Sequence, residues 1–331
     1  MVRPRMRQPG IIVLQSPRKV SIDKLHFDVD NIRIGHRNFE SEEAVAAALW
    51  EMPDMDLLYD DIKRRGLEEP PIVDHHSVVL EGNRRLAVCK RLNEEQNKGV
   101  KLQHDFSKIL CKEIDPSTSE LDKEAFLASV HIAGKYEWPD VSQGRLLKKL
   151  HEERNLSFET LAEITRKSKA TVIKKIAAYE LLERYRKKFS NDQDWADKYP
   201  HMWELLRKDL EDIRDDTKKF DMFMRWLHEG RISNSKDVRL LNLILKNPKA
   251  LRALQEEGMG QAIYKLMIQD PSIRSPTYKK ITNITKLLYA FPTKDFVETL
   301  NDEVRISVLQ DLHKATKRLL DQIQSAKGDK K

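Results

Sequence analysis

The sequence predicts an α+β protein in which a small sheet near the N-terminus is followed by helices alone. Runs rich in β-branched residues, such as IIVL, PPIVD and SVVLEG, all occur before residue 115. After Pro116 the chain is rich in Leu, Lys, Glu and Arg, with apolar residues three and four positions apart, which is typical of amphipathic helices. With 331 residues, the chain is long enough for two or three domains with separate cores.

The composition indicates a polar protein without a membrane partner. Charged residues make up 34% of the chain, the formal net charge is +7 and the mean hydropathy is −0.63. We see no apolar stretch of eighteen residues, so no membrane span is expected. The apolar run behind the basic start MVRPRMRQPG is too short for a signal peptide, which favours a cytoplasmic location. The surplus of basic residues is compatible with a nucleic-acid partner.

The first part of the chain carries the predicted strands. Residues 1–17 are expected to form a basic arm and a first strand, and the arginines of the arm either contact phosphates or are solvated. Residues 18–115 are expected to form an α/β domain, with Val20, Ile22 and Leu25 pointing inward. Its expected elements are strands within 11–27, helices at 41–50 and 55–65, strands at 70–74 and 77–82, a helix at 86–95 and a strand at 108–114. Ser41 is expected to cap the first of these helices.

We predict no metal site in this chain. His75 and His76 lie next to each other in the turn between two strands, so we expect their side chains to point apart. Cys89 and Cys111 form neither a metal-binding pattern nor a disulfide framework.

The rest of the chain is predicted to be helical. Residues 116–190 form one helical domain and residues 191–331 form a helical accessory domain that offers a surface for a protein partner. The expected helices are 120–131, 139–153, 157–165, 168–183, 200–214, 217–228, 235–246, 248–256, 259–268, 276–290, 292–300 and 302–325, followed by a disordered KGDKK tail. The apolar stripe of residues 302–323 is either an internal packing face or the seam of a homodimer.

Residues 156–178, LSFETLAEITRKSKATVIKKIAA, predict two short helices separated by a tight turn. Ser157 and Ser168 are each placed to cap the helix that follows. The residues expected to point inward are Leu161, Ala162, Ile164, Val172, Ile173 and Ile176. This pattern is typical of a helix-turn-helix unit, in which a small residue such as Ala162 lets the helices approach and the second helix enters a major groove of DNA.

The same region concentrates positive charge. Between residues 157 and 190, nine Lys or Arg residues accompany four Glu residues, which gives a net charge of +5. We expect Lys169 and Thr171 to read base edges, whereas Arg166, Lys174 and Lys175 contact phosphates of double-stranded DNA. The complete predicted DNA-binding set is Arg166, Lys167, Ser168, Lys169, Thr171, Lys174 and Lys175. The alternative is an ordinary helical hairpin with a solvated basic face.

The stretch 78–92, VVLEGNRRLAVCKRL, joins a predicted strand to a predicted helix. Arg84 and Arg85 fall in the first helical turn, where the helix dipole favours negative charge instead. A phosphate at this turn would be held by free backbone N–H groups, by the dipole and by guanidinium groups together. The alternative is a strand–turn–helix joint with two solvated arginines.

The order of DNIR, GLEEPPIV, EGNRR and the two-helix pattern resembles that of the ParB family of partition proteins, over residues 18–185. The resemblance implies a ParB/sulfiredoxin-like domain that binds CTP with magnesium, followed by a DNA-binding helix-turn-helix. The residues that it implies for the nucleotide are Gly66 and Pro71 on the base and ribose side, and Gly82, Asn83, Arg84 and Arg85 around the phosphates. Asn83 replaces the Glu of the family's GERR loop, and Ala87 stands where a third arginine is expected.

A third nucleotide segment of that family departs further from the pattern. Its ENxxR motif aligns with His131-Ile132-Ala133-Gly134-Lys135, so Lys135 alone keeps a charge suited to phosphate. His131 and Ile132 cannot replace two oxygen ligands of magnesium, which leaves both the metal and the choice of nucleoside triphosphate open. His131, Lys135 and Trp138 share one helical face, as either a remodelled pocket wall or part of the core.

We interpret the chain as a cytoplasmic, nucleoid-associated ParB-like DNA-binding protein with a pocket for CTP or another phosphate ligand. Partition, regulation and a mobile-element or defence system are the roles considered. The alternative is an enzyme of the same superfold: a CTPase-like NTPase, a nuclease or an ATP-dependent phosphotransferase. In that case Glu81 would be a general base or metal ligand and His131 an acid or base.

Overall fold

The computed structural model describes residues 12–29, 39–134 and 138–328. The chain divides into two compact units, Met1–Asn242 and Leu243–Lys331. The DNIR segment lies outside the described residues, as do Arg3, Arg5 and Arg7 of the arm and the last three residues of the KGDKK tail. The first two residues of that tail, Lys327 and Gly328, are helical, so the prediction that they are disordered is wrong. The predicted domain boundaries at 115 and 190 both lie within the first unit and stay predictions.

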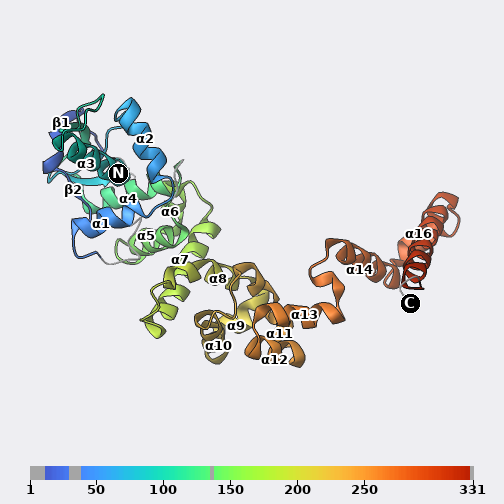
Figure 1. The fold of residues 1–331 in the computed structure, drawn as a ribbon. Coiled ribbons are helices and arrows are strands. Elements are labelled where there is room, and N and C mark those ends of the chain that lie inside the picture. The colour runs from blue at the N-terminus through green and yellow to red at the C-terminus, as the bar shows by residue number, and fades with distance from the viewer. Residues whose placement is uncertain (1–11, 30–38, 135–137, 329–331) are drawn as a thin grey trace, which may run out of the picture. The chain divides into compact units, whose positions relative to one another are not determined.

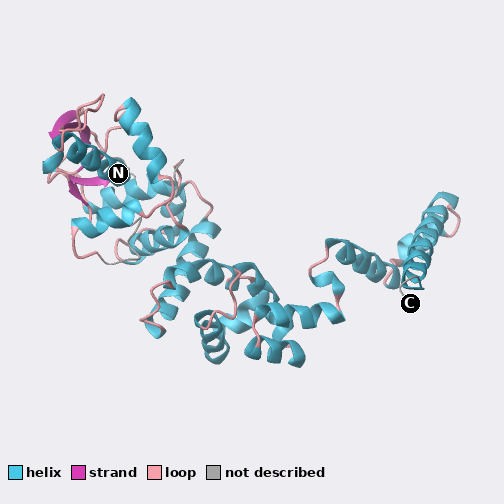
Figure 2. Cartoon of the chain, viewed as in Figure 1, coloured by secondary structure: helices cyan, strands magenta, loops and turns pink. Residues whose placement is uncertain are grey.

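A five-stranded mixed sheet opens the first unit (Figures 1 and 2), as expected for an α+β protein. Its strands are β1 (Arg18–Ser21), β2 (His26–Phe27), β3 (Ile72–Val73), β4 (Val78–Glu81) and β5 (Lys108–Glu113). The spatial order is β1-β5-β3-β4-β2. The pairs β1/β5 and β3/β4 are antiparallel, whereas β3/β5 and β2/β4 are parallel. The loop between β4 and the next helix is therefore carried by a strand near one edge of the sheet.

Three helices pack with the sheet: α1 (Glu42–Trp50), α2 (Met55–Arg65) and α3 (Asn83–Asn97). The Ser41 hydroxyl accepts a hydrogen bond from the Ala44 N–H at 3.3 Å, which confirms the predicted cap of α1. Val20, Ile22 and Leu25 are all buried in one apolar cluster, as predicted. Ile22 lies in the 3-10 turn η1 (Ile22–Lys24), because the chain bends there between β1 and β2.

The helical remainder of the first unit has a second apolar cluster, which includes Leu127, Trp138, Leu147, Leu161 and Val172. Its elements are α4 (Glu120–His131), α5 (Asp140–Glu152), α6 (Phe158–Thr165), α7 (Lys169–Lys188), η2 (Trp195–Lys198), α8 (Tyr199–Leu205), η3 (Lys208–Leu210), α9 (Glu211–Asp215), α10 (Thr217–His228) and η4 (Ser235–Leu240); α11 (Leu241–Leu245) spans the boundary between the units. All of these described helices except α11 therefore lie wholly within the first unit.

The helix expected at 200–214 is wrong as a single element. The backbone of Arg207 is extended, with φ −68° and ψ 145°, so α8 ends and the short η3 and α9 follow. The bend allows Leu210 to be fully buried. The carbonyl oxygen of neighbouring Asp209 accepts a hydrogen bond from Nδ2 of Asn242 at 3.0 Å, a contact between distant residues that the local helical pattern does not contain. The helix expected at 235–246 likewise begins as the 3-10 helix η4.

The second unit contains α12 (Pro248–Glu256), α13 (Met259–Gln269), η5 (Pro271–Ile273), α14 (Pro276–Tyr289), α15 (Thr293–Thr299) and α16 (Glu303–Gly328). α12 and α13 pack together through buried Ala250, Leu254, Ala262, Ile263 and Leu266. No helix within the described ranges has the length and apolar character needed to cross a bilayer.

Candidate functional site

The two helices α6 and α7 are joined by a tight turn whose geometry follows from the residues at its ends. The hydroxyls of Ser157 and Ser168 each accept a hydrogen bond from a backbone N–H three residues on, that of Thr160 and of Thr171, both at 3.1 Å. These bonds satisfy otherwise free donors of the first helical turns. Arg166 closes α6 in the left-handed region at φ 51°. The turn therefore fixes how α7 leaves α6.

The N-terminal end of α7 is open to solvent. Arg166, Ser168 and Lys169 are exposed, and the Lys169 ammonium forms an ion pair with Glu159 of α6. Lys167 is half-buried. Thr171 is also half-buried, and its hydroxyl lies 2.9 Å from that of Ser168. The exposed side chains that a phosphate or a base edge could reach are therefore grouped at the turn.

The prediction that Ile173 points inward is wrong, because 39% of this residue is exposed. It lies one turn after Lys169 and on the same face of α7, next to exposed Ala170. Sequence reasoning missed Ala170 and Ile173 as members of the outer face. A helical projection could have indicated both residues, because it places them near Lys169.

Lys174 and Lys175 do not lie on the outer face of α7 where they were expected. The Lys175 side chain is only 8% exposed and its ammonium forms an ion pair with Asp140 at the start of α5. The Lys174 ammonium lies 4.1 Å from the centre of the Trp203 ring of α8. Burial disfavours the charged ammonium of Lys174 and so lowers its pKa. The cation–π contact with Trp203 stabilises the same charge and offsets this cost. Both lysines therefore anchor α7 to neighbouring helices.

The EGNRR turn places Gly82 at the start of α3 with φ +100°. A Cβ at Gly82 would lie 3.0 Å from the Cβ of Pro71 and 3.1 Å from Nη2 of Arg85, so only glycine suits this backbone conformation in so little space. No side chain caps α3 and no acid occupies its first turn. The structure thus brings together Gly82, Pro71 and Arg85, three of the residues predicted for the nucleotide.

Arg85 is held by the protein's own carboxylates. Its guanidinium donates to the Glu69 carboxylate at 3.0 Å and to the Glu69 carbonyl oxygen at 3.0 Å, and it also pairs with Glu81. The Arg85 side chain is 15% exposed, whereas that of Glu69 is 83% exposed. An anion at this turn must therefore compete with two carboxylates for one guanidinium.

Arg84 turns to a different segment. Its Nε lies 3.3 Å from Sδ of Met55 and its Nη2 donates to the Pro53 carbonyl oxygen at 3.2 Å. Asn83 is buried and donates from Nδ2 to the Val79 carbonyl oxygen at 2.8 Å, while its Oδ1 has no hydrogen-bond partner among the described residues. The twin arginines therefore do not form one cluster, contrary to the simplest form of the phosphate hypothesis.

The other predicted residues lie in structural surroundings. Gly66 ends α2 at φ +80°, where a Cβ would lie 3.2 Å from the His104 ring. His131 is buried and stacks on buried Trp138, with ring centres 4.2 Å apart and planes 13° apart. Because Trp138 belongs to the second apolar cluster, this contact favours the core interpretation of His131. Lys135 lies outside the described residues.

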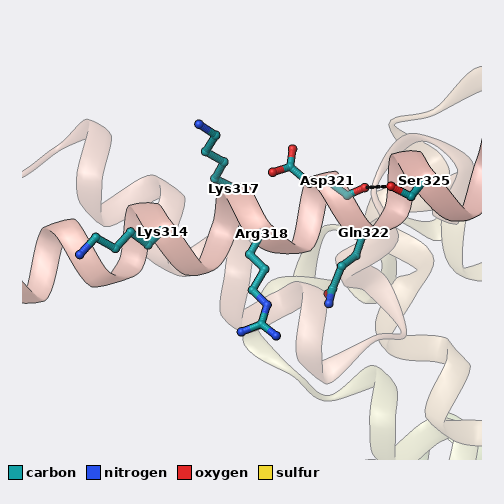
Figure 3. Close-up of a pocket in the computed structure, with 6 residues that line it drawn as sticks. All are labelled: Lys314, Lys317, Arg318, Asp321, Gln322 and Ser325. Atoms are coloured by element: carbon teal, nitrogen blue, oxygen red, sulfur yellow. Dashed lines mark hydrogen bonds between the residues drawn. The ribbon is translucent and has the colours of Figure 1, made fainter.

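The prediction that the side chains of His75 and His76 point apart is wrong, because their ring centres are 3.9 Å apart. Within the described ranges, no group of three or more His, Cys, Asp or Glu residues could hold a metal ion. An open hollow of about 530 Å³ lies along α16 (Figure 3), and all six residues that line it come from that one helix. Lys317 and Asp321 point to one side of α16 and Arg318 and Gln322 to the other, so this hollow is surface relief without convergent side chains.

Comparison with known proteins gives no assignment. No protein-family model matches the chain, and no curated protein sequence matches it. A C-terminally truncated chromosome-partitioning protein ParB from Caulobacter crescentus, complexed with the centromeric parS site, is 13% identical and gives a TM-score of 0.34 over 68% of this chain and 98% of that chain. The same truncated protein complexed with CTP-γ-S is 16% identical, with a TM-score of 0.21 over 63% and 97% of the two chains. A Pnob8-like ParB-N domain is 16% identical, with a TM-score of 0.36 over 82% and 98%. With TM-scores this low, the likeness carries no argument about fold or function.

Proposed function

We propose that this protein binds duplex DNA through α6 and α7, acting as a helix-turn-helix. The observation that carries the proposal is the doubly capped joint between these helices, which leaves Arg166, Ser168 and Lys169 exposed at the start of α7. In helix-turn-helix proteins, the residues at this end of the second helix reach the base edges.

The contacts of the lysines divide α7 into a DNA face and an anchored face. Lys169 and Arg166 are the cations proposed to meet phosphates, because Lys174 and Lys175 are occupied by Trp203 and Asp140. The ion pair of Lys169 with Glu159 joins two exposed side chains, so it costs little to exchange for a phosphate. Exposed Ala170 and Ile173 offer apolar contact to a thymine methyl group.

Salt dependence of DNA binding separates the two faces. Binding sites would first be selected from random duplexes with the full-length protein, and affinity then measured by fluorescence anisotropy at several salt concentrations. Lys169→Ala is expected to reduce the slope of log K against log salt by about 0.9, the value for one lost phosphate contact. Lys101→Ala, an exposed lysine outside these helices, is the matched control and should leave the slope unchanged.

Lys174→Ala provides the second comparison, with folding checked by circular dichroism. It should also leave the salt slope unchanged, because this ammonium faces Trp203. A normal slope for Lys169→Ala together with a reduced slope for Lys174→Ala would refute the proposed division of α7.

A phosphate-bearing ligand at Gly82–Arg85 is the second candidate function. The uncapped start of α3 and the unpartnered Oδ1 of buried Asn83 favour it, whereas the carboxylates on Arg85 oppose it. Since Glu69 is largely exposed, its pairing with Arg85 is the contact that a nucleotide phosphate would replace. Together with the resemblance described above, this favours a ParB-like role with CTP as the first ligand to test.

Binding of CTP, ATP and GTP, with and without magnesium and DNA, tests the second candidate. Calorimetry on the wild type and on Arg84→Ala should show a loss of affinity in the variant, and phosphate release would reveal hydrolysis. Equal, negligible binding by both proteins would leave Gly82–Arg85 as a structural joint. The enzyme alternative is less supported, because Glu81 pairs with Arg85 and His131 stacks on Trp138.

A further inference from the structure

The longest stretch of the chain without an acidic residue runs from residue 271 to residue 294, although Asp and Glu make up 53 of the 331 residues. The stretch includes all of α14, whose start is capped by the hydroxyl of Ser275. Its five basic residues are Arg274, Lys279, Lys280, Lys286 and Lys294. The three lysines of α14 itself are all exposed. This helix therefore presents positive charge and carries no acid of its own.

The large apolar side chains of α14 are exposed as well. They are between 41% and 90% exposed, and they are Tyr278, Ile281, Ile284, Leu287, Leu288 and Tyr289. No residue of α14 is buried, although helices in water owe most of their stability to the packing of an apolar face. A contiguous apolar surface of this kind marks a site of interaction.

The apolar and basic side chains have a definite order around α14. At 100° per residue, an arc of about 140° contains five of the six large apolar residues, namely Ile284, Leu288, Ile281, Tyr278 and Tyr289. Lys280 lies about 40° beyond one border of this apolar arc, and Lys286 lies about 60° beyond the other. Asn283 lies on the opposite side of the helix. α14 is therefore amphipathic, with a cation on each side of its apolar arc.

An anionic lipid surface matches this arrangement. The apolar arc can enter the boundary between headgroups and acyl chains, while the bordering lysines extend to the phosphate oxygens. Tyr278 and Tyr289 suit the same boundary, because each has an apolar ring and a polar hydroxyl. Duplex DNA matches the lysines but offers no apolar counterpart to the arc. α16 also exposes apolar side chains, but it carries the acids Glu303, Asp311 and Asp321, so its charge does not select a lipid surface.

We propose that α14 lies flat on an anionic phospholipid membrane and attaches the protein to its surface. With 14 residues, α14 is about 21 Å long, whereas a spanning helix must cross about 30 Å. The expectation of no membrane partner rested on the lack of a spanning segment, which a helix in the interface does not require. The proposal is independent of the proposed DNA binding, since it rests on residues 271–294 alone.

Sedimentation with lipid vesicles tests the choice of partner. The full-length protein should bind vesicles of phosphatidylcholine mixed with phosphatidylglycerol and stay in solution with phosphatidylcholine alone, because the lysines require a negative surface. Equal binding to both kinds of vesicle would refute the role of charge. Binding to neither would overturn the proposal, and would leave the apolar arc to a protein partner.

Two variants with the same change of charge separate insertion from electrostatic adsorption. Ile281→Glu places a carboxylate at the centre of the apolar arc, whereas Asn283→Glu, the matched control, places one on the opposite side. Ile281→Glu should bind the anionic vesicles at least about tenfold more weakly than Asn283→Glu. Circular dichroism checks that both variants keep their helix content. Equal affinities of the two variants would show that the arc does not insert.

A polarity-sensitive fluorophore reports which side of α14 meets the lipid. Tyr289→Cys lies at a border of the arc, where the side chain is 90% exposed, and Asn283→Cys is the control. The natural thiols of Cys89 and Cys111 are both buried. A nitrobenzoxadiazole label at position 289 should shift its emission to the blue on anionic vesicles, whereas the same label at position 283 should not. A shift at position 283 without one at position 289 would overturn the proposed orientation.

Discussion

Gly144 lies where α5, α7 and α8 meet, and its replacement tests how α7 is held. A Cβ at this position would lie 2.9 Å from the Lys175 carbonyl oxygen, 3.1 Å from Cβ of Tyr179 and 3.1 Å from the hydroxyl of Tyr199. That hydroxyl donates a hydrogen bond to the same carbonyl oxygen at 3.1 Å. Because the nearest atom belongs to a helix backbone, Gly144→Ala must separate the helices and cannot be relieved by one side chain.

The expected cost combines three contributions. Alanine is favoured over glycine inside a helix by about 1 kcal/mol. Overpacking of a tight contact costs about 1–3 kcal/mol, and loss of the hydrogen bond between Tyr199 and Lys175 costs about 0.5–1.5 kcal/mol more. The free energy of unfolding should therefore fall by about 1–3 kcal/mol in Gly144→Ala, despite the better helix former.

Urea unfolding measures this change. All five tryptophans precede residue 243, so their fluorescence reports on the first unit, while far-UV circular dichroism reports on both units. Gly260→Ala in α13 is the matched control, because nothing lies within 4 Å of a Cβ there and the free energy of unfolding should rise slightly. If Gly144→Ala also gained stability, the close approach of α5, α7 and α8 would be refuted.

Two further substitutions probe buried charge. Burial lowers the pKa of His201 below its ordinary 6.5, so the unfolded chain binds the proton more readily than the folded chain. The free energy of unfolding should therefore have its full value above pH 6.5, and below that pH it should fall by up to about 1.4 kcal/mol per pH unit. Urea titrations at pH 7.5 and 5.5 should show this loss in the wild type and a smaller one in His201→Gln; an equal loss in both would exclude His201 as the cause. Burial alone would raise the pKa of Glu124, but hydrogen bonds from Arg154 and Lys149 outweigh it and hold this pKa below 4.5. Glu124→Gln should lower the free energy of unfolding by about 1–3 kcal/mol at pH 7, a range that is reduced because Arg154 is partly exposed. The difference from wild type should shrink as the pH falls below 4.5, because the carboxylate then becomes protonated. A variant as stable as wild type at pH 7 would show that the ion pairs contribute nothing net.

The sequence predicted the elements whose causes are local. Ser41, Ser157 and Ser168 were assigned as helix caps from their position alone, and all three accept the expected backbone hydrogen bond. A cap and the first helical turn are separated by only three residues, so their interaction can be seen in the sequence. The break after Leu205, beyond which Leu210 is fully buried, was not indicated by any local pattern.

The candidate site divides in the same way. Glu81 and Arg85 are four residues apart with α3 beginning between them, so their pairing could have been anticipated from spacing. The partner of Lys175 is Asp140, 35 residues away, and Lys174 contacts Trp203 of a later helix. Counting charge along α7 therefore could not show that both lysines contact other helices of the first unit.

These contacts give the two ends of the proposed DNA surface different energetic roles. Lys174 and Lys175 fix α7 against α5 and α8, so the exposed turn at Lys169 is presented on a rigid helix. A prepositioned contact loses less conformational entropy on binding, which raises affinity without any added charge. Substitution at Lys174 should consequently change stability with an unchanged salt slope, whereas substitution at Lys169 should change the salt slope with unchanged stability. If substitution of either lysine changed both the stability and the salt slope, α7 would not have separate DNA-binding and anchored faces. The net charge of +5 between residues 157 and 190 would then be the better guide to DNA binding.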